Sequence, residues 1–176
     1  MFARYLETGA EIMDQLLNVP NGLARPMSNM AASLWATIDR YVIIPSNSDG
    51  QTPIYAYEVD GFGGRILMDD ANIPSLLSLP FLGYLDRDDP IYQNTRHFVL
   101  SSGNPWFSRG PVISAVGGPH IRPGTAWPMA SIARILTSDD EEIVGQLQEL
   151  VSSTDGLGLI HESINSFDQS RWTRQW

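Results

Sequence analysis

Apolar residues at helical spacing are the feature that most constrains the fold of this chain. They recur every three or four positions in segments near residues 2–16, 28–41, 90–102, 128–136 and 138–151, with Pro or Gly breaks between the segments. Each segment predicts a helix with one buried face. Because most of the breaks are short, neighbouring helices are expected to form antiparallel pairs. The sequence therefore predicts a mainly helical fold of about three helical hairpins.

Residue types at the segment ends support this interpretation. The Pro-Asn-Gly step at residues 20–22 ends the first helix, and Ser28 is placed to cap the second. Residues 138–141 read Ser-Asp-Asp-Glu, the pattern of a capping box ahead of the last helix. Pro74 is suited to begin a short helix, which Pro80 would end because proline lacks a backbone donor.

One β-hairpin is expected within this helical chain. The β-prone runs Ile54–Val59 and Arg65–Met68 flank an Asp-Gly-Phe-Gly-Gly loop at residues 60–64. The polar run 45–50 reads as a surface loop ahead of the hairpin. The fold class predicted from these signals is all-α, with a small β-hairpin near residues 54–68.

Asp69 and Asp70 follow the hairpin directly, and Asn72 comes two residues later. Adjacent carboxylates repel each other and lose hydration when buried, so a ligand, a cation or hydrogen-bond donors must compensate. The pair therefore marks a candidate site. The alternative is that one aspartate caps the following helix while the other is solvated.

Residues 103–125 form a second candidate region. The segment holds five glycines and four prolines, together with Trp106, Phe107 and His120. It is too long and too apolar for a simple connection, and a loop of this kind is typical of a binding site.

Composition excludes several function classes. The chain has 20 Asp and Glu against 11 Lys and Arg, a net charge of −9, which disfavours a nucleic-acid partner. It has no cysteine, so thiolate nucleophiles and zinc–sulfur sites are excluded. His97, His120 and His161 lack metal-ligand spacing, although the Asp69–Asp70 pair could hold a hard cation. No apolar run of membrane-spanning length and no signal-peptide pattern is present in these residues.

Seven short blocks, in order along the chain, carry a resemblance to one enzyme family. They read M-D-D-A-N-I-P-S-L-L-S-L-P-F-L-G-Y, N-P-W-F-S-R-G-P, G-G-P-H, A-W-P-M-A-S-I, L-T-S-D-D-E-E-I, L-G-L-I-H-E-S and W-T-R-Q-W. These blocks resemble glycoside hydrolase family 125, the metal-independent exo-α-1,6-mannosidases, in its fungal branch. The resemblance extends from Met1 to Trp176.

The resemblance implies a fold and a reaction. Members of the family adopt an (α/α)6 barrel and hydrolyse α-mannosides with inversion of configuration. Inversion needs a general base and a general acid on opposite faces of the sugar. The resemblance places Glu162 at the general base, with an α-mannoside oligosaccharide or N-glycan-derived mannan as substrate, and with no metal and no cofactor.

The resemblance also implies substrate-binding positions. They are Asp69, Asp70, Asn72, His120, Trp127, His161 and Arg174. Glu162 and three of these positions also have a plainer interpretation from chemistry alone. Glu162 and Arg174 would be ordinary surface charges, His120 a loop histidine with satisfied hydrogen bonds, and Trp127 a core residue.

Two departures from the family pattern limit what the resemblance implies. The general acid is an aspartate in an S-G-F-R-P-S-D-D block, and no such block occurs in the 176 residues. Gln175 also stands where proline is usual, and Ile164 where an aromatic residue or valine is common. Residues 1–176 are therefore expected to be a partial domain, about half of the barrel, without the N-terminal half and the final helix.

An open hydrophobic face would follow from half a barrel. The chain alone is then expected to be poorly stable, prone to association and nearly inactive. The alternative function is a non-catalytic mannoside-binding remnant. A different hydrolase on a helical-hairpin barrel, acting on glucans or uronides, is a second alternative.

Overall fold

The protein is described from a computed structural model that covers residues 1–16, 22–46 and 52–175. The helices are α1 (Phe2–Leu16), α2 (Ala24–Tyr41), α3 (Pro90–Val99), α4 (Pro128–Leu136) and α5 (Asp140–Ser152). The strands are β1 (Ile43–Ser46), β2 (Thr52–Tyr55), β3 (Glu58–Val59), β4 (Arg65–Ile66), β5 (Phe107–Arg109), β6 (Ser114–Val116), β7 (Thr125–Ala126), β8 (His161–Asn165) and β9 (Asp168–Gln175).

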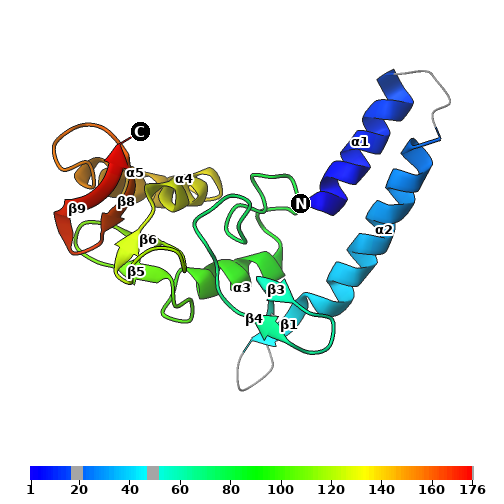
Figure 1. Cartoon of the computed structure of the whole chain (residues 1–176), viewed down its shortest axis with the longest axis horizontal. Helices are drawn as coiled ribbons and strands as arrows, with labels where there is room; N and C mark the ends of the chain where they lie inside the picture. The colour runs from blue at the N-terminus through cyan, green and yellow to red at the C-terminus, as the bar shows by residue number, and fades with distance from the viewer. Residues whose placement is uncertain (17–21, 47–51, 176) are drawn as a thin grey trace.

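Helices α1 and α2 form an antiparallel hairpin that projects from the rest of the chain (Figure 1). Small residues such as Ala10 and Ala31 are buried, and a Cβ on Gly9 would lie 2.7 Å from Met27 Cε. Small side chains therefore let the two helices approach closely. The prediction of two helices is confirmed, while the predicted stop at residues 20–22 falls largely outside the described residues.

The start of α2 corrects one prediction. The helix begins at Ala24, so Ser28 lies inside it and is not its cap; Leu23 is the N-cap residue and makes no side-chain capping bond. Pro26 falls in the first turn of α2, where the backbone lacks an intrahelical acceptor for an N–H group. Proline is tolerated there, so Pro26 does not prevent the helix from beginning ahead of Ser28.

Two short hairpins, made of four strands, occur in the region where one hairpin was predicted. β1 pairs with β2, with Ile44 opposite Ile54, and β3 pairs with β4, with Val59 opposite Arg65. The run 54–59 thus belongs to two hairpins, and Pro45 and Ser46 lie in a strand rather than a loop. Residues 47–51 of that predicted loop lie outside the described residues. The glycine loop is confirmed as a turn, because Asp60 Oδ1 accepts hydrogen bonds from Phe62 N at 2.7 Å and Gly64 N at 2.9 Å.

The helix predicted from Pro74 is wrong. Residues 71–85 form a series of turns. Ser75 and Ser78 hydrogen-bond each other's backbone, and Asp69 accepts the amides of Leu76 and Leu77. Side chains thus take the place of helical hydrogen bonds in a segment bounded by two prolines.

Helix α3 lies at the centre of the molecule. It begins at Pro90, as predicted, with Asp89 Oδ1 accepting the Tyr92 amide at 2.8 Å, and it ends at Val99 rather than near residue 102. Tyr92, Thr95 and Val99 are buried. The Tyr92 hydroxyl donates to Leu77 O at 2.9 Å and joins α3 to the turns before it.

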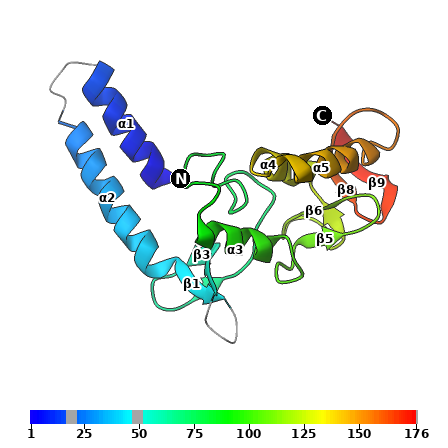
Figure 2. The ribbon, with the colours of Figure 1, turned by 180° about the vertical axis from the view of Figure 1, so that it is seen from behind.

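The C-terminal region mixes helices and strands. Helix α4 has the predicted bounds, and α5 is capped by Asp139, which accepts the Glu142 amide. Figure 2 shows these helices above β5, β6 and β8. β5 pairs with β6, and β7, β8 and β9 form a three-stranded antiparallel sheet. The prediction of an all-α chain with one small hairpin is therefore confirmed only in part: the described residues form five of the expected helices, but they also form antiparallel strands after α3 that the sequence did not predict.

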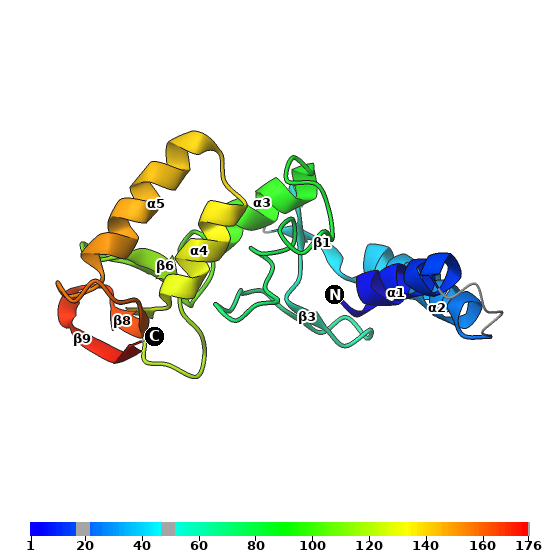
Figure 3. The same ribbon diagram turned by 90° about the horizontal axis from the view of Figure 1, so that it is seen from above.

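Three buried apolar clusters lie within the described residues, and the two larger ones each join several elements. One joins α3, the turns before it and β2 through Tyr92, Val99 and Leu77. The other joins β6, β7, β8 and α4 through Ile113, Ala126 and Ile164. Figure 3 shows the β3–β4 hairpin and the loop between β6 and β7 extending to one side of the molecule, away from α3 and α5. The cluster that contains Ile113 also contains Ala71, which follows Asp70, and Trp127 packs against it.

Candidate active site

Asp69 is a buried carboxylate with only protein partners. Its Oδ1 accepts the Leu76 amide at 2.8 Å and its Oδ2 accepts the Leu77 amide at 3.0 Å. Burial raises the pKa of Asp69 to about 7, although the two amide hydrogen bonds act in the opposite direction. Since both oxygens are occupied and the side chain has no exposed surface, Asp69 organises the turns rather than facing solvent.

Asp70 has different partners from Asp69 and contacts two other polar side chains. Its Oδ1 accepts both the backbone amide and the side-chain amide of Asn72, each at 2.8 Å. Its Oδ2 lies 3.7 Å from His120 Nδ1. Neither aspartate is therefore the freely solvated group of the plainer interpretation, and Asp70 is the one of the two that meets the other predicted site residues.

The close approach of Asp70 and His120 depends on a glycine. A Cβ on Gly118 would lie 2.8 Å from Asp70 Oδ2 and 2.8 Å from His120 Cε1. The Ala71 amide also donates to Gly117 O at 2.8 Å, which joins the two segments through their backbones. The Gly-Gly-Pro-His block thus brings its histidine to the carboxylate because its glycines leave room.

Trp127 supports His120 from the side. The two rings meet edge to face at 88°, with centroids 5.1 Å apart. The Trp127 amide donates to Val116 O, and the residue stands at the N-cap of α4, so the ring is fixed by the start of a helix. Its indole nitrogen is buried without a hydrogen-bond partner in the part of the chain that the structure describes. Trp127 thus packs against the buried core and also contacts the His120 ring.

Glu162 and Arg174 face each other on β8 and β9. Arg174 Nε donates to Glu162 Oε2 at 2.9 Å, and Arg174 Nη2 donates to Oε1 at 2.6 Å. Hydrogen bonds from Arg174, with smaller contributions from Thr173 and the charge of His120, lower the pKa of Glu162.

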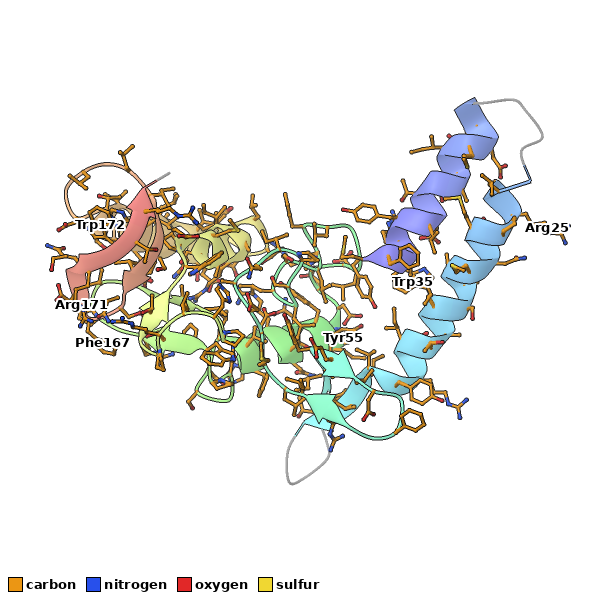
Figure 4. All side chains as sticks on the ribbon, in the orientation of Figure 1. Arg25, Trp35, Tyr55, Phe167, Arg171 and Trp172 are labelled. Atoms are coloured by element: carbon orange, nitrogen blue, oxygen red, sulfur yellow. The ribbon has the colours of Figure 1, made fainter. Side chains whose placement is uncertain are left out.

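His161 is buried, unlike its neighbour Glu162. It has 1% of its surface exposed and stacks on Trp172, with centroids 4.2 Å apart and an interplanar angle of 10°. Within the described residues neither ring nitrogen has a hydrogen-bond partner. Figure 4 shows Trp172 on β9 at the opposite end of the molecule from Arg25 on α2. In this structure His161 contacts the protein interior rather than an open surface.

The structure thus brings together most of the predicted residues. Asp70, Asn72, His120, Trp127, Glu162 and Arg174 are joined in a chain of contacts and electrostatic interactions, while Asp69 and His161 lie beneath it. Sequence reasoning missed Tyr57: burial, followed by the charges of Asp70 and Asp69, raises the pKa of Tyr57. Its place in the Tyr-Glu-Val run gave no signal, because the charges that act on Tyr57 belong to Asp69 and Asp70, beyond the hairpin loop.

Within residues 1–16, 22–46 and 52–175, no group of three His, Cys, Asp or Glu side chains has a metal-binding arrangement. The candidate site offers carboxylates, an amide, an imidazole and an indole face. These groups suit the hydroxyl groups and ring faces of a sugar. None of the helices in the described parts of the chain is both long and apolar enough to span a membrane.

Comparison with known proteins gives a consistent result. A Schizosaccharomyces pombe protein, the meiotically up-regulated gene 157 protein, is 51% identical over 152 residues, which cover 82% of this chain and 30% of that protein. A solved Streptococcus pneumoniae structure from a family of metal-independent alpha mannosidases, a non-productive substrate complex with alpha-1,6-mannobiose, matches with a TM-score of 0.93 and 36% identity. That match covers 99% of this chain and 41% of the other.

The chain therefore spans less than half the length of each of these two relatives. The five helices and small antiparallel sheets in the described parts of this chain are consistent with a piece of the fold of the solved mannosidase. The sequence profile of the family described as metal-independent alpha-mannosidase (GH125) matches residues 1–176, the whole of the printed sequence. The chain belongs to this family of glycoside hydrolases.

Proposed function

We propose that these residues form part of an inverting α-mannosidase in which Glu162 is the general base. The proposal is supported by the paired contact of Glu162 with Arg174, by the electrostatic influence of His120 on Glu162, and by the approach of His120 to Asp70, all in a chain of this family. The substrate class is an α-mannoside oligosaccharide, including α-1,6-linked mannan derived from N-glycans. The family resemblance and the mannobiose complex of the S. pneumoniae protein support this choice.

The reaction begins at a water molecule beside Glu162. The carboxylate takes a proton from the water while the water oxygen bonds to the anomeric carbon. The bond between that carbon and the leaving oxygen breaks, and a general acid on the opposite face protonates the leaving oxygen. We infer that this acid lies outside residues 1–176, in the (α/α)6 barrel of the longer protein. In such inverting enzymes the two carboxyl groups are about 6.5–9.5 Å apart, which leaves room for the water.

The remaining residues bind or support. Asp70, Asn72 and His120 offer acceptors and donors for the hydroxyl groups of the sugar, and Trp127 holds the imidazole in place. Asp69 shapes the turn that carries Asp70, and His161 anchors β8 through its stacking on Trp172. The last two are therefore proposed as supports rather than sugar contacts.

The test uses a longer family member, such as the S. pombe protein, with the glutamate that aligns with Glu162 changed to glutamine. A general base typically contributes about 10²–10⁴-fold to rate, so hydrolysis of α-1,6-mannobiose should fall by that order. Proton NMR of the first product should show the β-anomer, as inversion requires. Unchanged turnover in the Gln variant, or an α-anomer as the first product, would contradict the proposal.

A non-catalytic mannoside-binding chain is the second candidate. It is favoured by the sugar-compatible groups in residues 1–176 together with the lack of the family's acid block there. In that case the 176-residue chain should bind mannobiose in a calorimetric titration with no turnover. Its Glu162→Gln variant should bind equally well, because the base is not needed for recognition.

A further inference from the structure

The contact between Glu162 and Arg174 is a product of strand register. His161 pairs with Gln175 and Ser163 pairs with Thr173, so Glu162 and Arg174 stand opposite each other. Two nitrogens of the guanidinium donate to the two carboxylate oxygens at 2.9 and 2.6 Å. A two-point contact of this kind fixes the plane of the carboxylate as well as its position.

Neighbouring residues hold both strands in this register. Ser163 Oγ lies 2.8 Å from Thr173 Oγ1, and the Ser163 amide donates to the same oxygen at 3.2 Å. Thr173 Oγ1 also lies 3.5 Å from Glu162 Oε2. Beneath them, the stacked rings of His161 and Trp172 join the strands through the interior. Contacts between Ser163 and Thr173 and between His161 and Trp172 therefore hold together the two strands that carry Glu162 and Arg174.

We propose that Arg174 is a positioning residue, which fixes the orientation of the Glu162 carboxylate toward the attacking water, rather than a residue that contacts the sugar. The proposal rests on the proposed function, since it assigns Glu162 the role of base. It replaces the substrate-binding role that the family resemblance implied for Arg174. Glu162 Oε2 accepts from both Arg174 and Thr173, whereas Oε1 accepts from Arg174 Nη2 and has a second lone pair that can accept the proton from water.

Charge supports the same role. Arg174 is the largest influence that lowers the pKa of Glu162, and it keeps the carboxylate ionised, as a base must be, to lower pH. The groups that lower the pKa of Glu162 are Arg174 and Thr173 from β9, which contact it, and His120 from the loop before β7, which acts through its charge. Because 68% of the Arg174 side chain and 20% of the Glu162 side chain are exposed, salt should weaken the electrostatic part of the effect.

The first test measures the pKa of Glu162 directly, by carboxyl-carbon NMR titration of the 176-residue chain. Arg174→Met should raise this pKa, and Arg174→Lys should restore part of the difference, because lysine keeps the charge but not the two-point contact. Arg171→Met is the matched control. Arg171 lies on the same strand, near Trp172 in Figure 4, and its charge acts on Asp168 rather than on Glu162. An unchanged pKa in Arg174→Met, or an equal rise in Arg171→Met, would overturn the proposal.

The second test separates positioning from sugar binding in the longer S. pombe relative, at the residue that aligns with Arg174. A positioning role predicts that the Met variant lowers kcat by about tenfold or more, leaves KM nearly unchanged and moves the acidic limb of the pH–rate profile to higher pH. A rise in KM with an unmoved acidic limb would assign Arg174 to the sugar instead. If the NMR shift occurs but the Gln variant of the base keeps full turnover, the contact stands and the proposed function fails.

Discussion

The α1–α2 hairpin and the β8–β9 hairpin are both two-element units, yet they are stabilised differently. The helices contact each other through small buried residues such as Ala10 and Ala31, while large apolar side chains such as Phe2, which is 64% exposed, face solvent. β8 instead buries Ile164 completely, in a cluster with β6, β7 and α4. The helical unit is therefore local, while the strand unit is part of a shared core.

This difference determines where in the molecule a catalytic side chain can be held in a fixed position. A carboxylate is held in place only if its strand or helix is fixed by contacts with other elements. β8 has such contacts on the interior side, through His161 and Ile164, and it carries Glu162 between them. The exposed apolar side chains of α1 and α2 agree with the expectation of an open face, whereas poor stability and association stay predictions.

The largest expected effect tests the shared core. Ile164→Ala should lower the free energy of unfolding by about 2–5 kcal/mol, because it removes buried apolar contacts and leaves a cavity. Ile164→Val, which removes one methylene, should cost about 0.5–1.5 kcal/mol. Urea unfolding followed by tryptophan fluorescence measures both. A cost below 1 kcal/mol for the alanine variant would show that β8 is no better anchored than the helical hairpin.

A smaller effect is expected at the turns that carry Asp70. Asp69→Asn leaves one oxygen to serve two amides, so the Leu76 or Leu77 N–H loses its partner at a cost of about 1–3 kcal/mol. The matched control is Asp60→Asn in the exposed glycine loop, whose two amides bond a single carboxylate oxygen that asparagine retains. The control should therefore lose less stability than the buried variant. Equal losses would show that burial does not matter at Asp69.

The same carboxylate predicts a pH dependence of stability. The pKa of Asp69 is about 7 in the folded chain, against about 3.9 for an unfolded aspartate. Between these values the folded state binds more protons than the unfolded state, so stability should fall as pH rises from about 4 to about 7 and then level off. Unfolding at several pH values should show this fall in the parent chain. Its persistence in Asp69→Asn would assign it to another group.

Sequence reasoning succeeded where the signal was local. Helix α4 begins at the proline that predicted it and ends where the apolar spacing ends, because both signals lie within the segment. The β8–β9 hairpin was missed because β9 is largely polar, reads Asp-Gln-Ser-Arg-Trp-Thr-Arg-Gln, and shows no alternation. Its stability comes from pairing with β8 and from the ring stack, which no local pattern reports.

In the candidate site too, the residue types could be predicted from the sequence, while their contacts could not. Residue types and the family resemblance pointed to Asp70, His120 and Glu162; in the structure His120 lies 3.7 Å from Asp70, and its charge acts on Glu162. Sequence could not separate Asp69 from Asp70, because the difference between them is burial and the choice of amide partners. The contact of Arg174 with Glu162 depends on strand register, and a shift of one residue would remove it.

The smallest expected effect on stability lies on the helical hairpin. Phe2→Ser removes a side chain that is mostly exposed, so the free energy of unfolding should change by no more than about 0.5 kcal/mol. Self-association should nevertheless decrease, because exposed apolar side chains promote contact between copies. Sedimentation velocity over a range of concentrations measures this, with Glu11→Ser on the same helix as a polar control. If Phe2→Ser costs as much stability as Ile164→Val while association is unchanged, then α1 packs as part of a core, and the contrast between the two hairpins is lost.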